Sequence, residues 1–225
     1  MSMPFYVSPE QLIKDRAEFA QKGIARGRSM VASIYDKGVL LVAENPSASL
    51  NKLSEIYDRI AFAGVGKYNE FDRLREAGIR WADSTGFTYS RDDVDARALA
   101  NYYAQYLGTT FTEGPKPLEI EILVAQLGGR LRPTKLYHLA YEGTITDEPR
   151  FAVLGGDAET IKQRFADSDA GESDLTTALH HARNALGGPD RVIVPADLEV
   201  AILEDRGFRR TFTRLNDATV AQILA

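Results

Sequence analysis

The chain of 225 residues contains MVASIYDKGVLLVA at residues 30–43, and this stretch decides the fold. Met30–Tyr35 and Val39–Ala43 are both rich in apolar and β-branched residues, as strands are. Asp36-Lys37-Gly38 between them has the composition of a three-residue hairpin loop with glycine at its left-handed position. We therefore expect the two runs to pair as antiparallel strands close to the start of the chain.

A helix is expected before this hairpin. Ser8-Pro9-Glu10-Gln11 combines a capping serine, a proline suited to the first helical position, and a glutamine three residues after the cap. Apolar residues then recur at spacings of four and three until Gly27; they are Ile13, Ala17, Ala20 and Ile24. Residues 8–26 therefore predict an amphipathic N-terminal helix, preceded by a tail of residues 1–7.

After the hairpin, predicted strands come in hairpins and predicted helices come in pairs. Leu53–Val65 is a β-rich run with a break near Asp58. A helix from Gly66 to about Ala82 precedes a second that begins at Ser90. The residues expected to form the buried stripe of this second helix are Val94, Ala98, Tyr102 and Tyr106.

The remaining predicted elements are strands at Leu118–Leu127, Leu136–Tyr141 and Phe151–Leu154, helices at Asp157–Phe165 and Ser173–Leu186, strands at Leu198–Leu203 and Arg210–Leu215, and a short helix at Ala218–Leu224. This order lacks the strict strand-helix alternation of a parallel sheet. It favours an α+β fold in which two antiparallel sheets pack face to face, each covered by a helix pair. No linker divides the chain, so we expect one domain over residues 1–225, with the sandwich at 27–225.

The composition excludes several classes of protein. The 27 basic and 32 acidic residues give a net charge of -5 without long runs of like charge, which argues against a nucleic-acid surface. Without cysteine, the chain can form neither a disulfide nor a thiolate metal site. The sequence has no signal-like segment and no apolar stretch of membrane-spanning length. These features predict a cytoplasmic protein with no membrane contact.

Cofactor motifs are incomplete. Gly64-Val65-Gly66-Lys67 stands where a phosphate loop would, but Ala61 and Tyr68 replace the required glycine and the magnesium-binding hydroxyl, so a glycine turn is expected. His138 stands alone, and the helical neighbours His180-His181 point about 100° apart. The sequence therefore predicts no metal site and no bound cofactor.

Catalytic side chains are also weakly indicated. Glu119 and Glu121 alternate along one predicted strand and are expected on its solvated face. The layered architecture suggests one alternative, an N-terminal nucleophile hydrolase in which processing would expose Ser29. Arg28 and a well-formed helix precede Ser29, and this context argues against a removable propeptide.

A set of motifs spread along the chain is similar to one family. They are SPEQ at 8–11, EFA at 18–20, GIARG at 23–27, GVLLVAENPS at 38–47, KLSEIYDR at 52–59, GKYNEFD at 66–72, LGTTFTE at 107–113 and LEVA at 198–201. Over nearly its whole length the chain resembles the α-type subunits of the proteasome core particle, in their actinobacterial version. This resemblance implies a four-layer αββα sandwich, with the N-terminal helix as the feature that separates α-type from catalytic β-type chains.

The resemblance also bears on catalysis. In β-type chains a threonine opens the first strand and is assisted by an aspartate after the second strand and a lysine on the third. The matching positions here are Arg28, Glu44 and Lys52, and arginine has no nucleophilic oxygen. The resemblance therefore implies a non-catalytic subunit of a threonine-type endopeptidase, with no catalytic residue of its own.

The same resemblance implies partners and sites. Seven α-type chains form rings that cap two β rings and gate the entry of substrates for degradation. Pockets in the α ring accept the C-terminal tails of a proteasomal ATPase ring and of an ATP-independent activator, and substrates include unfolded or pupylated proteins. Lys52 matches the pocket lysine of the family. The gate is expected in the bulky tail residues Met3, Pro4, Phe5, Tyr6 and Val7.

Overall fold

Two five-stranded antiparallel sheets form the centre of the molecule. The structure, a computed structural model, describes residues 8–129, 132–168 and 173–225. Sheet A has the order β10-β9-β2-β1-β8 and sheet B the order β3-β4-β5-β6-β7. The strands are β1 (Met30–Tyr35), β2 (Gly38–Glu44), β3 (Leu53–Tyr57), β4 (Ile60–Gly66), β5 (Ile120–Gln126), β6 (Lys135–Leu139), β7 (Ile145–Glu148), β8 (Phe151–Leu154), β9 (Leu198–Glu204) and β10 (Phe212–Leu215).

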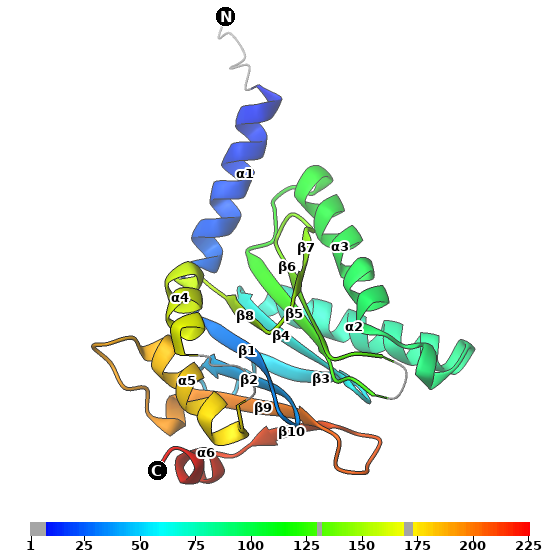
Figure 1. Cartoon of the computed structure of the whole chain (residues 1–225). Coiled ribbons are helices and arrows are strands. Elements are labelled where there is room, and N and C mark those ends of the chain that lie inside the picture. The colour runs from blue at the N-terminus through cyan, green and yellow to red at the C-terminus, as the bar shows by residue number, and fades with distance from the viewer. Residues whose placement is uncertain (1–7, 130–131, 169–172) are drawn as a thin grey trace, which may run out of the picture.

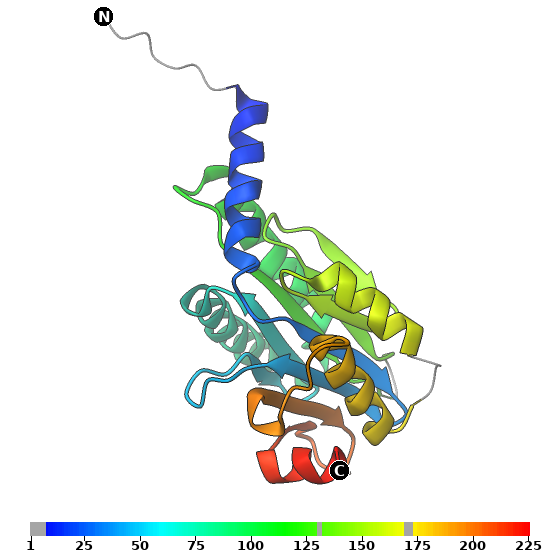
Figure 2. The ribbon, with the colours of Figure 1, turned by 90° about the vertical axis from the view of Figure 1, so that its left-hand side faces the viewer.

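Helix pairs cover the outer faces of the two sheets. Helices α2 (Tyr68–Thr88) and α3 (Ala96–Glu113) lie against sheet B, whereas α4 (Ala158–Ser168) and α5 (Leu175–Gly187) lie against sheet A. Figure 2 shows α2 on one side of the strands and α4 and α5 on the other. The chain ends in α6 (Asp217–Ile223). The α+β sandwich predicted from the sequence is therefore confirmed.

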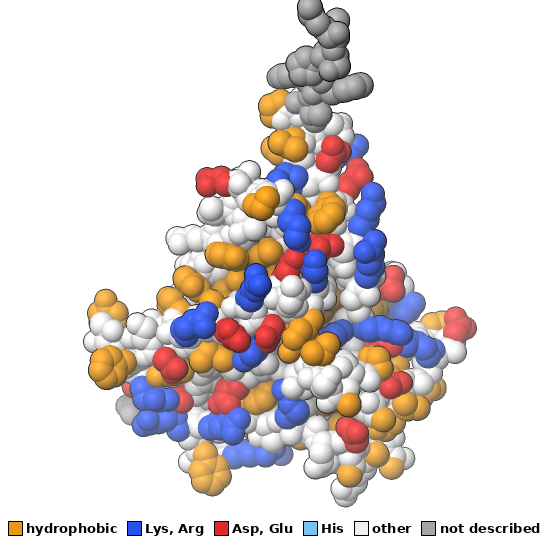
Figure 3. Space-filling model, turned by 180° about the vertical axis from the view of Figure 1, so that it is seen from behind, with side chains coloured by type: hydrophobic (Ala, Val, Ile, Leu, Met, Phe, Trp, Pro, Cys, Tyr) orange, Lys and Arg blue, Asp and Glu red, His pale blue; other side chains and the backbone are white. Residues whose placement is uncertain are grey.

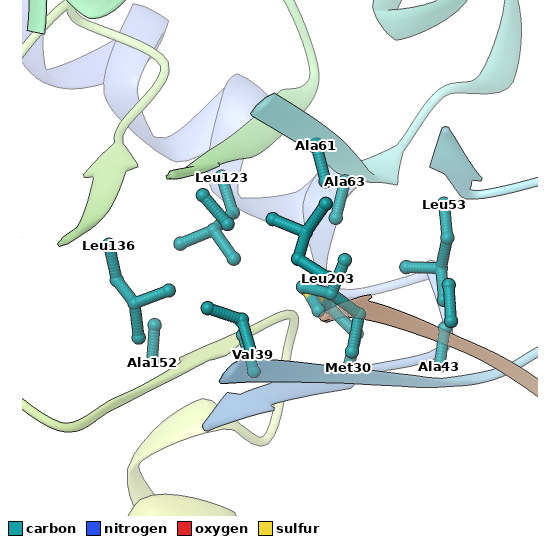
Figure 4. Packing of buried hydrophobic residues seen from close by; sticks show 14 of the residues in the cluster. Met30, Val39, Ala43, Leu53, Ala61, Ala63, Leu123, Leu136, Ala152 and Leu203 are labelled. Carbon is teal, nitrogen blue, oxygen red and sulfur yellow. The ribbon is translucent and has the colours of Figure 1, made fainter. Parts of the chain in front are cut away.

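Three apolar cores hold these layers together. One lies between the sheets, and Figure 4 shows its side chains meeting from both sides. The other two lie between each sheet and its helix pair. Alternate residues of β2 serve two of these cores: Val39 and Leu41 face the other sheet, whereas Leu40 and Val42 face the helices. Burial on both faces explains why β2 has a continuous apolar run instead of an alternating one.

The first hairpin is tighter than the expected three-residue loop. Tyr35 pairs with Gly38, so only Asp36 and Lys37 form the turn and β2 begins at Gly38. The glycine is required by a close approach: a Cβ atom on Gly38 would lie 1.9 Å from the carbonyl oxygen of Leu203 in β9. The constraint on residue 38 therefore comes from the neighbouring strand, and its φ is not left-handed.

Helix α1 (Pro9–Ile24) begins as predicted, with the Ser8 hydroxyl accepting a hydrogen bond from the backbone N–H of Gln11. Only its C-terminal part is buried, at Ala20 and Ile24, whereas Ile13 is 56% exposed. Figure 1 shows why, because the first turns of α1 extend beyond the sheets. Figure 3 shows apolar side chains on this projecting part.

Val94, which precedes α3, is buried as predicted, but within α3 the predicted buried stripe is wrong by one position. Tyr102 and Tyr106 are 39% and 52% exposed, and the buried residues are Leu99, Tyr103 and Leu107. Both stripes have helical spacing, so the sequence pattern alone does not distinguish them. Gly78 in α2 makes the difference, because a Cβ atom there would lie 1.7 Å from the Tyr103 hydroxyl oxygen. This glycine opens the space that Tyr103 fills.

Helix α2 runs to Thr88, beyond its expected end near Ala82, and the start of α3 and strand β7 also differ from expectation. Ser90 caps only a 3₁₀ turn, Arg91–Asp93, and α3 begins later with Asp95 as its cap. Strand β7 was not predicted, since its sequence ITDE is polar and it pairs only with β6 at the edge of sheet B. The expected break near Asp58 is confirmed, because β3 and β4 form a hairpin around it.

Candidate functional site

Arg28, Glu44 and Lys52 lie together where three strands begin or end. Arg28 precedes β1, Glu44 is the last residue of β2, and Lys52 precedes β3. The Lys52 ammonium donates hydrogen bonds to the carbonyl oxygens of Arg28 at 2.6 Å and Glu44 at 3.0 Å. The side chain of Lys52 thus joins the ends of the first two strands to the start of the third.

The Glu44 carboxylate is held by two arginines. It accepts a hydrogen bond from Arg28 at 2.7 Å and two from Arg191 at 2.6 and 2.9 Å. The hydrogen bonds from Arg191, followed by the charges of Arg28 and Lys52, hold the pKa of Glu44 below its usual value, although burial acts in the opposite direction. We call these four residues, Arg28, Glu44, Lys52 and Arg191, the Lys52 cluster.

The Lys52 cluster carries an excess of positive charge, with three cations around one carboxylate. Burial lowers the pKa of Lys52 from 10.5 to about 8, and the carboxylates of Glu199 and Glu44 only partly offset this effect. An ammonium has three donors, of which two are used by the carbonyls. Within the described residues, the third donor of Lys52 has no recorded acceptor, and it lies beside two half-exposed guanidinium groups.

The Lys52 cluster offers no hydroxyl or thiol nucleophile. Arg28 has no oxygen to attack with, and Ser29 lies in the segment between α1 and β1. Ser29 is buried, its carbonyl accepts the Glu44 N–H at 3.1 Å, and its hydroxyl lies against Gly155. The geometry suits binding of an anion better than covalent catalysis.

A second ionic cluster corrects the expectation for Glu119 and Glu121, which are largely buried and not on a solvated face. Glu119 forms ion pairs with Lys67 at 3.6 Å and with Lys116 at 3.3 Å, and the same two lysines pair with Glu70. We call Lys67, Glu70, Lys116 and Glu119 the Glu70 cluster. Strand alternation could not reveal that other segments cover this face of β5.

The covering segments come from elsewhere in the chain. Gly23 of α1 lies directly on Glu119, because a Cβ atom at Gly23 would be 2.4 Å from the Glu119 carboxylate oxygen. Glu121 accepts the backbone N–H of Gly155 at 3.2 Å and lies 3.7 Å from His138. Both glutamates are therefore part of the packing between β5 and its neighbours.

The other sequence predictions are placed as follows. The proposed gate residues Met3, Pro4, Phe5, Tyr6 and Val7 lie outside the described residues. In the part of the chain that the structure describes, no group of three or more His, Cys, Asp or Glu side chains is arranged to hold a metal ion. No helix of that part combines the length and apolar character needed to cross a bilayer.

Comparison with known proteins agrees with the fold. The model of the family described as "Proteasome subunit" matches residues 24–189, which is more than half of the chain. The chain belongs to the proteasome subunit family. The matched region begins at the end of α1 and includes the entire Lys52 cluster apart from Arg191.

Curated relatives place the chain on the α side of this family. It is 59% identical to proteasome subunit alpha of Acidimicrobium ferrooxidans, with coverage of 100% of this chain and 97% of that protein. It is 52% identical to the subunit alpha of Sanguibacter keddieii and 48% identical to that of Mycobacterium avium, with coverage of 100% of this chain and 90% and 91% of those proteins. The chain is thus an α-type subunit of the proteasome core, non-catalytic by itself, and this membership implies assembly with β-type subunits into rings.

Proposed function

We propose that this α-type proteasome subunit forms seven-membered outer rings that gate entry to a β-ring chamber and dock activators at Lys52. In this proposal residues 1–7 form the gate tail, residues 8–26 the N-terminal helix and residues 27–225 the sandwich, all within one domain. The observation that carries activator docking is the excess positive charge of the Lys52 cluster.

The chemistry of a peptide C-terminus fits this cluster. A terminal carboxylate is an acceptor with no donor of its own, and the free N–H of the Lys52 ammonium is a complementary donor. A lysine acts as a point charge on a flexible stem, so it tolerates the approach of a tail that enters from outside. Arg28 and Arg191 add positive charge to the site while they remain paired with Glu44.

The proposed partners follow from the resemblance to actinobacterial α subunits. They are a proteasomal ATPase ring and an ATP-independent activator, each docking through its C-terminal tails, together with a β-type subunit that supplies threonine-type endopeptidase activity. We further propose that the substrates are unfolded or pupylated proteins and that the particle works in the cytoplasm. The relatives named proteasome subunit alpha support the α-type assignment from which these proposals start.

Substitution of Lys52 tests the docking proposal. In particles assembled with the β partner, Lys52→Ala should prevent the activator from raising peptide hydrolysis above the unstimulated rate. Lys22→Ala, which removes a well-exposed lysine on α1, is the matched control and should leave the stimulation unchanged. Native mass spectrometry should show seven-fold rings for both variants. Full stimulation of Lys52→Ala particles would refute the docking site.

The gate is tested separately by deletion of residues 2–7. The deletion leaves the Ser8 cap and α1 intact, and identical tails in a seven-fold ring would converge on its axis. The truncated particle should hydrolyse peptides faster without an activator, and unfolded protein faster still. If both substrates are degraded at the rate of the intact particle, entry is controlled by another segment.

The alternative, an active hydrolase that uses Ser29 after processing, makes an opposite prediction. The purified chain without a β partner would hydrolyse a fluorogenic peptide, and Ser29→Ala would abolish that activity. N-terminal sequencing gives an independent answer, since an intact start at Met1 or Ser2 excludes processing before Ser29. We expect no activity and no processing.

A further inference from the structure

Glu199 is a nearly buried carboxylate close to the Lys52 cluster but not part of it. It is the second residue of β9, and its side chain is 7% exposed. Side chains alternate along a strand, so Glu199 shares the face of Ala201 and Leu203, which belong to the core between the sheets. A carboxylate in this position is costly unless it is fully hydrogen-bonded.

The partners of Glu199 all lie around the loop that ends at Lys52. One carboxylate oxygen accepts the backbone N–H of Lys52 and the side-chain amide of Asn45, each at 2.8 Å. The other accepts the backbone N–H of Leu53 at 3.1 Å and pairs with Arg214. Glu199 therefore holds both ends of loop 45–52, and it holds Lys52 by the main chain.

The two neighbouring contacts reinforce this arrangement. The Asn45 amide also donates to the carbonyl oxygen of Leu50 at 2.6 Å, which closes the loop on itself. Arg214 donates to the carbonyl oxygen of Leu53 at 2.6 Å, so that the first residue of β3 is fixed on both its N–H and its C=O. The backbone position of Lys52, from which its side chain extends, is thus fixed by Glu199 of sheet A, whereas Lys52 itself leads into sheet B.

We propose that Glu199 is a positioning residue for the docking lysine: it fixes the backbone of Lys52 so that the ammonium group reaches the chain end that it binds. The inference rests on the proposed role of Lys52 in binding terminal carboxylates. Glu199 itself does not touch the ligand, because its oxygens are occupied by Asn45, Lys52, Leu53 and Arg214.

Two substitutions separate the effect of the length of the Glu199 side chain from the effect of its charge. Glu199→Gln keeps the length but replaces one acceptor oxygen with a donor, so it cannot accept both backbone N–H groups and pair with Arg214. Glu199→Asp keeps the charge but shortens the side chain by one methylene. Glu70→Gln is the matched control, since Glu70 is another nearly buried carboxylate that accepts a backbone N–H, from Glu119 at 2.7 Å, and a lysine, Lys116.

The first measurement follows Lys52 directly and does not depend on docking. Assembled particles are acylated with an amine-directed reagent across a pH series, and the extent of labelling at Lys52 is read by peptide mass spectrometry. Glu199→Gln should shift the labelling profile to lower pH, because the carboxylate that raises the pKa of Lys52 is gone. Glu199→Asp should change the labelling rate with less effect on the midpoint. Glu70→Gln should leave the profile unchanged.

The second measurement follows binding. A fluorescent peptide with the C-terminal residues of the activator is titrated with particles, and its C-terminal amide serves as the ligand control. Both Glu199 variants should weaken binding of the free acid by about tenfold, which corresponds to about 1.4 kcal/mol. The amide should bind weakly to every particle, and Glu70→Gln should bind the acid as the parent does.

The outcomes distinguish this inference from the docking proposal. A Lys52 labelling profile that is unchanged in both Glu199 variants would overturn the positioning role, whatever the binding data show. A changed labelling rate in Glu199→Asp particles, which keep the charge, combined with tight peptide binding by Lys52→Ala particles, would preserve the positioning role and refute docking. If Glu199→Gln particles do not assemble, the Glu199→Asp variant provides the same decision.

Discussion

The Lys52 cluster and the Glu70 cluster have similar components but a different charge balance. The Glu70 cluster has two lysines for two carboxylates, and Glu70 also accepts the backbone N–H of Glu119. The Lys52 cluster has three cations for one carboxylate, and the adjacent Glu199 is already paired with Arg214. The charges of the Glu70 cluster balance, whereas the Lys52 cluster keeps an excess of positive charge, on which the proposed docking depends. The net charge of a cluster therefore indicates more about its function than the number of its ion pairs does.

The largest effect is expected from Gly66→Ala, which breaks the Glu70 cluster through the backbone. Gly66 has a φ of +103°, and a Cβ atom there would lie 2.0 Å from the carbonyl oxygen of Glu119. The strain and the clash should destabilise the chain by about 2–4 kcal/mol. Urea unfolding of the purified chain measures the change. Gly108→Ala is the control, because its nearest neighbour would be 3.5 Å away, and it should not lower stability.

The next effect is expected from Glu44→Gln, which removes the only carboxylate of the Lys52 cluster. The loss of hydrogen bonds from two half-exposed arginines should cost about 1–3 kcal/mol at pH 7. The folded chain holds the pKa of Glu44 below 4.5, so this stabilisation is present above that pH and is lost as pH falls below it. The difference in unfolding free energy between the parent and the variant should therefore narrow as pH falls below 4.5; a difference that stays constant over this range would contradict the assignment.

The third prediction concerns how the ionisation of Lys52 affects stability and activator stimulation as pH changes. The folded pKa of Lys52 is about 8, below its ordinary 10.5, so the unfolded chain binds more protons between these values and stability should rise with pH there. The same deprotonation removes the docking charge, so activator stimulation should decline as pH rises through about 8. Lys52→Arg, which stays charged, should retain its stimulation to higher pH. Parallel pH profiles for the two particles would argue against a role for the Lys52 charge.

The smallest effect is expected from Lys67→Ala in the balanced cluster. Lys67 is half exposed and lies 3.6 and 3.7 Å from the carboxylates of Glu119 and Glu70, whereas Lys116 lies 2.5 Å from Glu70. The change should cost less than about 0.5 kcal/mol, as is usual for exposed pairs. Thermal unfolding provides the measurement. A loss of stability as large as that expected for Glu44→Gln would show that Lys116 alone does not compensate the charges of Glu70 and Glu119.

The sequence was sufficient for the sandwich because its strands are apolar runs separated by turn residues. It was insufficient for β7, whose polar residues at a sheet edge resemble a loop, and for the buried face of α3, where two stripes had equal spacing. In each case the decisive information lay in another segment. Gly78, for example, selects Tyr103 for burial although it lies in a different helix.

The candidate site shows the same limit. Arg28, Glu44 and Lys52 were identified through the family resemblance, as the positions that match the catalytic residues of β-type chains, and they do lie together. Arg191 belongs to a loop without periodic pattern, and Glu199 stands within an apolar strand where a single glutamate gives no indication of its direction. Both reach the site through tertiary contacts between residues about 150 positions apart in the chain, which local patterns do not encode.

The strand orders of the two sheets have a consequence for synthesis. Sheet B is a meander of consecutive strands, so residues 53–148 can pair as soon as they leave the ribosome. Sheet A has the first hairpin at its centre and must wait for β8 on one side and β9 on the other. Lys52 is thus made early but gains Arg191 and Glu199 only when the chain is nearly finished. A polypeptide released before residue 191 therefore carries the lysine without the groups that order it.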